Sequence, residues 1–249
     1  MPVSASLLAA SGALRVASLD LCADEYLLLL ARPNEIASVS RVAQDPADSI
    51  LWRQAGRFRA NRRELDSVIA TRPTLLLSTS GGGRATTLIG ERLGIRSVTL
   101  GYPGSIAEVE ERMVRVATAL GNPRRANGWR QRLARLRADP LAQRDTIFLG
   151  GGGNSLSAGS LGAQWMALSG FRQRALPGGR ASLETLVVSP PKVLLRSTYR
   201  RSQPSLGQRW LDHPLAQRSV ARTIDTDGRP WTCAGPLMIK ELERLRALR

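Results

Sequence analysis

The sequence has few of the residues on which catalysis and metal binding depend. Its 249 residues include one histidine, His213, and two cysteines, Cys22 and Cys233, which lie near opposite ends of the chain. A structural zinc site takes about four nitrogen or sulfur ligands, so the chain is not expected to build one. The same scarcity leaves little material for a Cys–His hydrolase. We therefore expect no resident metal ion and no cofactor.

Long apolar runs and aromatic side chains are also scarce. No run approaches the roughly 18 apolar residues that a membrane-spanning helix needs. Aromatic residues make up 4% of the chain, whereas hydrophobic residues make up 43%. That hydrophobic fraction is large enough for a buried core and argues against a disordered tail. The length fits one large domain or two lobes.

Lysine is nearly absent, although the chain is strongly basic. Only Lys192 and Lys240 are lysines among 36 basic residues, and the formal net charge is +16. Such a charge is typical of proteins that bind nucleic acid or an anionic surface. The arginines are spread over the whole chain, however, and together with abundant Ala, Gly and Leu they indicate the codon bias of a GC-rich genome. We expect no nucleic-acid partner, and nucleic-acid binding remains a rival hypothesis.

Strand and helix patterns alternate along the chain, which is typical of an α/β fold with mostly parallel sheets. Residues 45–63 are polar and basic, and we expect mainly loop there, with short helical pieces. Strands are expected near residues 14–19, 36–40, 75–77, 97–100, 146–149, 193–195 and 221–224. Helices are expected near residues 23–31, 63–71, 85–93, 106–138 with an interruption at 121–123, 161–169, 183–188, 208–218 and 236–248.

The second half of the chain repeats a feature of the first half. An acidic residue opens a short helix at Asp66 and again at Glu184, and each is followed 7 residues later by a proline, Pro73 or Pro191, and then by a buried strand. The long helical stretch that begins with the capping pair Ser105 and Glu108 lies between the two copies. This arrangement predicts two similar α/β lobes joined by a helix.

Five segments together resemble one known family, the class III periplasmic substrate-binding proteins of ABC importers for ferric siderophores, heme and cobalamin. The segments are RVASLDLCADEYLL, ELDSVIATRPTLLL, SIAEVEERMVRVATALG, ASLETLVVSPPKVLL and WTCAGP. The resemblance implies two α/β lobes with mostly parallel sheets and a single long bridging helix. It divides the chain into residues 1–13, a signal remnant or disordered tail; 14–121, the N-terminal lobe; 122–143, the bridging helix; and 144–249, the C-terminal lobe.

The resemblance implies a receptor rather than an enzyme. Such a receptor captures a metal chelate, here of the ferric siderophore type, in the cleft between the lobes and delivers it to the membrane permease of an ABC importer. It would act as a monomer in the periplasm, with the export signal incomplete or missing in this sequence. A cobalamin or heme receptor of the same class is the first alternative. An α/β nucleotide-binding protein or enzyme that uses the glycine turns at residues 81–83 and 150–153 is a more distant one.

The candidate ligand-binding residues follow the expected strands, where α/β sheets bind their ligands. Arginine and tyrosine suit an anionic chelate because guanidinium and phenol groups donate to its oxygens, although several of these arginines are equally well explained as ordinary surface residues. Trp165 and Trp210 are expected in the core, and Trp129 against the bridging helix. The candidates are Cys22, Trp52, Arg84, Tyr102, Tyr199, Arg200, Trp231 and Cys233.

Three further residue assignments depend on the resemblance. Cys22 and Cys233 would border the cleft from opposite lobes, either as a disulfide or as thiols that touch the ligand. His213 is interpreted as a local structural residue rather than a ligand to heme iron. Asp66 and Glu184 match the acidic residue that each lobe of the related receptors presents to arginines of the permease. Lobe one carries Asp where the family pattern has Glu, and the neighbouring Glu64 could substitute for it.

Overall fold

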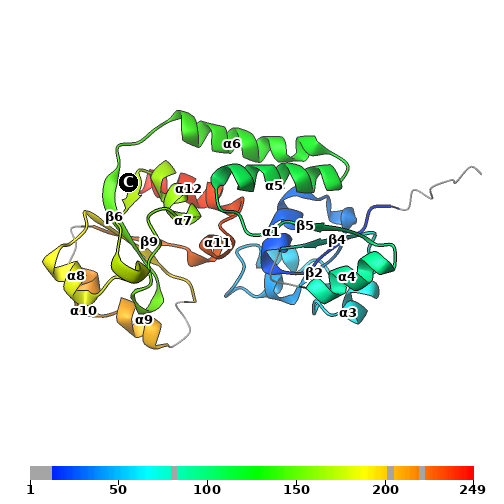
Figure 1. The fold of residues 1–249 in the computed structure, drawn as a ribbon, viewed down its shortest axis with the longest axis horizontal. Coiled ribbons are helices and arrows are strands. Elements are labelled where there is room, and N and C mark those ends of the chain that lie inside the picture. Colours follow the sequence, from blue (N-terminus) through cyan, green and yellow to red (C-terminus); the bar gives the residue numbers. More distant parts are fainter. Residues whose placement is uncertain (1–12, 80–82, 201–204, 219–221) are drawn as a thin grey trace, which may run out of the picture.

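The computed structural model describes residues 13–79, 83–200, 205–218 and 222–249, which form two α/β lobes that lie side by side (Figure 1). Every pairing between the strands is parallel, which confirms the predicted α/β class. The first lobe contains β1 (Val16–Ser18), β2 (Ile36–Ser40), β3 (Ala60–Asn61), β4 (Leu75–Ser78) and β5 (Arg96–Thr99). The second contains β6 (Arg144–Leu149), β7 (Phe171–Gln173), β8 (Val193–Ser197) and β9 (Thr223–Thr226).

The two sheets are built in the same way. The strand order is β3-β2-β1-β4-β5 in the first lobe and β7-β6-β8-β9 in the second. In the first sheet β1 lies between β2 and β4, and in the second sheet β6 lies between β7 and β8. Strands β4 and β8 therefore occupy equivalent positions. Both of these strands are buried, because helices cover both faces of a parallel sheet. The equivalence agrees with the internal repeat in the sequence.

Helices fill the connections between the strands. In the described part of the chain, none of them combines the length and apolarity needed to cross a membrane. The first half contributes α1 (Leu21–Leu30), α2 (Trp52–Ala55), α3 (Leu65–Ile69), α4 (Arg84–Arg92), α5 (Ile106–Ala119) and α6 (Asn127–Ala138). The second half contributes α7 (Leu161–Leu168), α8 (Leu183–Val188), α9 (Leu206–Leu211), α10 (Pro214–Arg218), α11 (Gly228–Cys233) and α12 (Leu237–Ala247).

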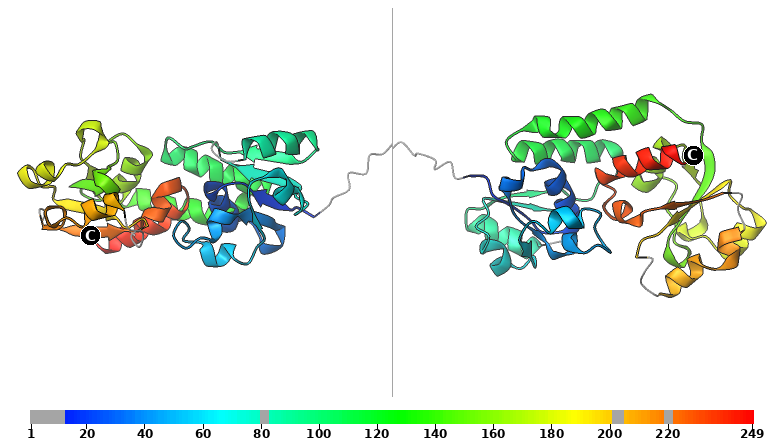
Figure 2. Two further views of the ribbon diagram at one scale, coloured as in Figure 1. Left: turned by 90° about the horizontal axis from the view of Figure 1, so that it is seen from below. Right: turned by 180° about the vertical axis from the view of Figure 1, so that it is seen from behind.

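The chain passes between the lobes through α6. Helix α5 begins at the predicted cap, where the Ser105 hydroxyl accepts a hydrogen bond from the Glu108 amide at 3.2 Å. It ends before Gly121, whose left-handed φ of 78° ends the helical run. After a short 3-10 helix (Pro123–Ala126), α6 returns beside α5 and reaches the second lobe, as Figures 1 and 2 show. Within residues 122–143, for which one bridging helix was expected, α6 covers only Asn127–Ala138.

Ion pairs fix α6 to a neighbour in each lobe. Glu110 of α5 accepts hydrogen bonds from Arg130 at 3.0 Å and from Arg137 at 2.9 Å. On the side of the second lobe, Arg132 forms a two-pronged ion pair with Glu243 of α12. The arginines of α6 are thus used partly for internal contacts, which is one reason why the high net charge need not mark a nucleic-acid surface.

One apolar core runs through both lobes. It includes Val16 and Tyr26 from the first lobe, Met113 from α5, and Trp165 and Met238 from the second lobe, all nearly or fully buried. Burial of Trp165 is as predicted from its helical pattern. Because the two lobes share packed side chains, a large hinge rotation would expose apolar surface to water.

The structure differs from the expected elements at several places. Residues 208–218 form two helices, α9 and α10, rather than one, because Pro214 lacks the amide hydrogen that a continuous helix needs. Trp231 and Cys233 belong to α11, in a stretch where no helix was expected, whereas Trp52 opens α2, one of the short helical pieces expected within residues 45–63. Strands β3 and β7 were not predicted, since segments of 2 and 3 residues carry too short an alternation to be recognised.

Candidate ligand-binding cleft

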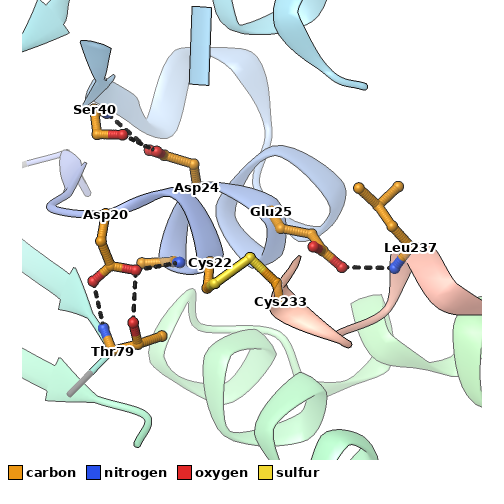
Figure 3. The surroundings of a disulfide bond; sticks show 9 residues. Asp20, Cys22, Asp24, Glu25, Ser40, Thr79, Cys233 and Leu237 are labelled. Carbon is orange, nitrogen blue, oxygen red and sulfur yellow. Dashed lines mark hydrogen bonds between the residues drawn. A yellow bond between two sulfur atoms is a disulfide. The ribbon is translucent and has the colours of Figure 1, made fainter. Parts of the chain in front are cut away.

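A disulfide joins the two lobes. Cys22 lies in the first turn of α1 and Cys233 is the last residue of α11, and their Cα atoms are 5.3 Å apart (Figure 3). The predicted proximity is confirmed, and the oxidation state that the sequence left open is the disulfide. The alternative of free thiols that touch the ligand is wrong for this structure, because both sulfur atoms are used in the bond.

Carboxylates of the first lobe surround this junction (Figure 3). Asp20 caps α1 and accepts hydrogen bonds from the Thr79 amide and hydroxyl, both at 2.7 Å, which ties the end of β1 to the end of β4. Asp24 accepts hydrogen bonds from the Ser18 hydroxyl and from the amide and hydroxyl of Ser40. Burial raises the pKa of Asp24 to about 7, although these hydrogen bonds oppose the shift. The carboxyl ends of three strands are thus held together at the base of the cleft.

Glu25 crosses between the lobes. Its carboxylate accepts a hydrogen bond of 2.6 Å from the Leu237 amide at the start of α12. A side chain at Gly235 would lie 2.8 Å from the Glu25 carboxylate, so the glycine of the WTCAGP segment makes room for this contact. Burial raises the pKa of Glu25 to about 8, and the Leu237 hydrogen bond only partly opposes it. At neutral pH the group is therefore mostly protonated.

The raised pKa of Glu25 predicts a pH-dependent stability. The folded protein holds this proton up to about pH 8, whereas the unfolded chain releases it near pH 4.5. The free energy of unfolding should therefore decrease as the pH rises from 5 to 8, because in this range the folded protein binds a proton that the unfolded chain has released. Glu25→Gln keeps an oxygen acceptor but no longer titrates, so urea unfolding at pH 5 and pH 8 should give a smaller difference in this variant.

The control for this prediction is Glu111→Gln, at an exposed carboxylate on α5. The control should show the same decrease between pH 5 and pH 8 as the unmodified protein. Salt-bridged carboxylates such as Glu35 have a lowered pKa, caused chiefly by the Arg125 hydrogen bond, and remain ionised throughout this range. An unchanged pH dependence in Glu25→Gln would contradict the assignment.

The first lobe has a basic cavity of about 600 Å³ at the carboxyl ends of β2 and β3. Three arginines give it a positive rim, and Asp45 and Asp48 lie among them. None of these residues was predicted as a ligand-binding residue, because β3, at whose end Arg62 and Arg63 lie, was not recognised in the sequence. The usable signal was Arg41, which directly follows the expected strand at residues 36–40. The cavity is lined by Arg41, Val42, Gln44, Asp45, Pro46, Asp48, Asn61, Arg62 and Arg63.

The second lobe has a cavity of about 530 Å³ at the carboxyl ends of β6 and β8, and it brings together three predicted residues, Tyr199, Arg200 and Trp231. The indole nitrogen of Trp231 donates to the Thr226 hydroxyl at 2.8 Å, and its ring packs against Phe148 at a centroid distance of 4.9 Å. The Trp231 ring is thereby held in a fixed orientation at the cavity wall. The cavity thus combines aromatic surface with a guanidinium group and a phenol.

Asp48 connects the two cavities. Its Oδ1 accepts hydrogen bonds from the Tyr199 hydroxyl at 2.7 Å and from Nε and Nη2 of Arg200 at 3.0 and 2.6 Å. Burial, followed by the hydrogen bond to Asp48, raises the pKa of Tyr199. A second contact joins the same loop to the other lobe, because Arg229 donates to the Pro46 carbonyl at 2.8 Å. Sequence reasoning did not identify Asp48.

The remaining predicted ligand-binding residues do not join these two cavities. Arg84 lines a separate cavity of about 320 Å³ at the ends of β4 and β5. The Trp52 ring is covered by the Arg53 guanidinium at 5.0 Å. Tyr102 is 62% exposed and lies between β5 and α5. Trp52 and Tyr102 line none of the three cavities, so the structure gives no support to a binding role for them.

Two other sequence features have structural explanations. His213 is exposed, and its Nδ1 accepts a hydrogen bond from the Leu215 amide at 3.2 Å, as expected of a local structural residue. The backbone at residues 150–153 packs against α9, and a side chain at Gly153 would lie 2.5 Å from the Ala181 carbonyl. Residues 80–82 of the other glycine turn lie outside the described residues. Among the described residues, no cluster of His, Cys, Asp or Glu is arranged to hold a metal ion.

Comparisons with known proteins identify the fold. No family model and no curated protein sequence matches the chain. Solved structures do match: the periplasmic heme-binding protein HutB of Vibrio cholerae has a TM-score of 0.71 at 17% identity, over 95% of this chain and 99% of that one. The periplasmic heme-binding protein RhuT from Roseiflexus sp. RS-1 has 0.66 at 19%, over 95% and 97%. The periplasmic vitamin B12-binding protein BtuF of Vibrio cholerae has 0.60 at 18%, over 94% and 95%. The chain therefore has the two-lobed fold of the periplasmic binding proteins.

Proposed function

We propose that the chain is the solute-binding receptor of an ABC importer and captures a metal chelate in the cleft between its lobes. The observation that carries the proposal is the pair of cavities at the carboxyl ends of the two sheets, joined across the lobes by Asp48. Ligands of α/β sheets bind at this edge. The similar folds include receptors for heme and vitamin B12, which supports a transport role and argues against catalysis.

The residues around the cleft favour an anionic iron chelate of the siderophore type. Arg41, Arg62 and Arg63 face the first cavity and Arg200 the second, and guanidinium groups donate well to carboxylate and catecholate oxygens. A heme or cobalamin receptor is the second candidate. It is favoured by the names of the similar structures and by the aromatic rings of Phe148 and Trp231 at the second cavity.

A periplasmic location and a monomeric state belong to the same proposal. The disulfide between Cys22 and Cys233 supports export, because structural disulfides persist in oxidising compartments. Delivery of the ligand would use Asp66 and Glu184, which lie at equivalent positions on the two lobes and are both exposed. The permease subunits are the partners implied.

Native mass spectrometry of the protein purified from its own host tests this function. A co-purified iron or cobalt chelate, confirmed by calorimetric titration of the stripped protein, is the expected result. Calorimetry with ATP and NAD serves as the comparison, since the rival α/β nucleotide-binding protein would bind one of them. Nucleotide binding together with no binding of ferric siderophores, hemin or cyanocobalamin would overturn the proposal.

A further inference from the structure

The hydrogen bonds of Asp48 resemble those that an anionic ligand would make. One carboxylate oxygen accepts from a phenol and from two guanidinium nitrogens, all between 2.6 and 3.0 Å. The carboxylate comes from the first lobe, whereas both donors come from the second lobe and line its cavity. Asp48 itself lines the cavity of the first lobe. The donors therefore face the space in which a bound ligand would lie.

Arg200 has a left-handed backbone conformation, which it shares with Arg63 and Arg72 among the described arginines. Its φ is +51°, in the left-handed region that non-glycine residues rarely adopt, and such residues cluster at ligand sites. The guanidinium lies 5.4 Å from the centroid of the Tyr199 ring. Gln208 donates to the Tyr199 carbonyl at 2.8 Å and so holds this segment from α9. The backbone that carries the two donors is thus held from within the second lobe, whereas their side-chain hydrogen bonds are made to Asp48.

We propose that Tyr199 and Arg200 form a carboxylate-binding subsite and that Asp48 is an internal competitor for it. A ligand carboxylate takes the place of Asp48 on the two donors, and the loop that carries Asp48 then separates from the second lobe. Because the contact of Asp48 with Tyr199 and Arg200 lies between the two cavities, its displacement opens a path from one cavity to the other. This inference rests on the proposed receptor function and specifies its ligand as one that bears a carboxylate.

The competition has a consequence for affinity. The apparent dissociation constant of a carboxylate ligand equals its intrinsic value divided by the fraction of molecules in which Asp48 has left the subsite free. Ligands without an acidic group cannot replace the charge-assisted hydrogen bonds that Asp48 makes with Arg200, so they gain less from displacing it. Asp48 therefore acts as a specificity-determining residue that selects anionic ligands.

Calorimetric titration with citrate, a metal-free tricarboxylate, tests the subsite at fixed physiological ionic strength. Asp48→Asn keeps the shape of the side chain but removes the competing charge, and should bind citrate roughly tenfold more tightly than the unmodified protein. Arg200→Gln removes the charged donor and should bind it roughly tenfold more weakly or not at all. Asp48→Ser is a second variant in case Asp48→Asn does not fold.

The control is Arg115→Gln, an exposed arginine on α5 that lies outside both cavities and should leave citrate affinity unchanged. Circular dichroism confirms that each variant is folded. A purely structural bridge would lower stability in Asp48→Asn without any gain in citrate affinity, and that result would overturn the inference. Absence of citrate binding in both the unmodified protein and Asp48→Asn would do so as well.

The test separates this inference from the proposed function. If metal chelates bind but respond to neither Asp48→Asn nor Arg200→Gln, the receptor function stands and the subsite is wrong. If citrate binds as expected but no chelate binds and none co-purifies, the subsite stands and the metal-chelate function fails.

Discussion

Replacing Asp66 and Glu184 together by alanine is expected to abolish transport through the proposed importer and to leave ligand affinity unchanged. Each is the second residue of its helix, α3 or α8, and these helices precede the equivalent strands β4 and β8. Both side chains are exposed, and α3 and α8 lie on the side of the molecule away from α6 (Figure 1). One carboxylate per lobe on a common side suits two permease subunits that are contacted at once.

The chemistry at these positions supports a contact with arginine. Hydrogen bonds from its own amide and from the Ser182 hydroxyl lower the pKa of Glu184, so this carboxylate remains charged at neutral pH. In a chain of net charge +16, exposed acids must attract arginines locally, against the field of the whole protein. Each substitution removes one charged partner of an interface arginine, so loss of both should lower transport by well over tenfold.

The measurement is ligand-stimulated ATPase activity of the importer in proteoliposomes, with ligand affinity determined separately. A matched control replaces Glu111 and Asp139, exposed acids on the other helical layer, and should retain stimulation. Because Asp66 is shorter than the expected glutamate, the neighbouring Glu64 is also removed in a triple variant. Full activity of that triple variant would contradict the assignment, and so would loss of ligand binding in a folded double variant.

The sequence predicted the parts of the fold that carry a long periodic pattern or a strong stop signal. Helix α8 has the predicted bounds because a capping serine precedes it and a proline follows it. Strand β2 has the predicted bounds because a charged turn precedes it and a polar run follows it. The equivalence of α3 and α8 followed from the same 7-residue spacing to proline. Helix α11 was missed because its sequence, GRPWTC, contains glycine and proline, and only the Asp227 cap and tertiary packing make it helical.

The candidate site was only half predictable, for a reason of geometry. Tyr199, Arg200 and Trp231 follow strands of one lobe, so their proximity depends on a single sheet and could be inferred from strand ends. Asp48 meets Tyr199 across 151 residues and between lobes, and that contact depends on how the lobes are oriented. No local pattern encodes the orientation. It is set by the shared core, the Glu25 contact and the disulfide.

Removal of the disulfide is expected to destabilise the whole chain. Cys22 and Cys233 are separated by 211 residues, so the bond closes nearly the entire chain into a loop. Cross-links restrict the unfolded chain more strongly as the loop lengthens, and a loop of this size gives about 5 kcal/mol in the chain-entropy model. Because engineered and native bonds often deliver less, we expect a loss of roughly 3–5 kcal/mol in the free energy of unfolding for Cys22→Ser with Cys233→Ser.

Urea unfolding followed by tryptophan fluorescence measures this loss, as a decrease of about 1–2 M in the midpoint for a protein of this size. Dithiothreitol should shift the unmodified protein to the midpoint of the double-serine variant and should leave that variant unchanged. The shared core is expected to keep the reduced protein folded at low urea, with both lobes unfolding together. If reduction does not move the urea midpoint, the disulfide does not contribute to the free energy of unfolding and the prediction is wrong. If two separate transitions appear, the disulfide rather than the core couples the lobes.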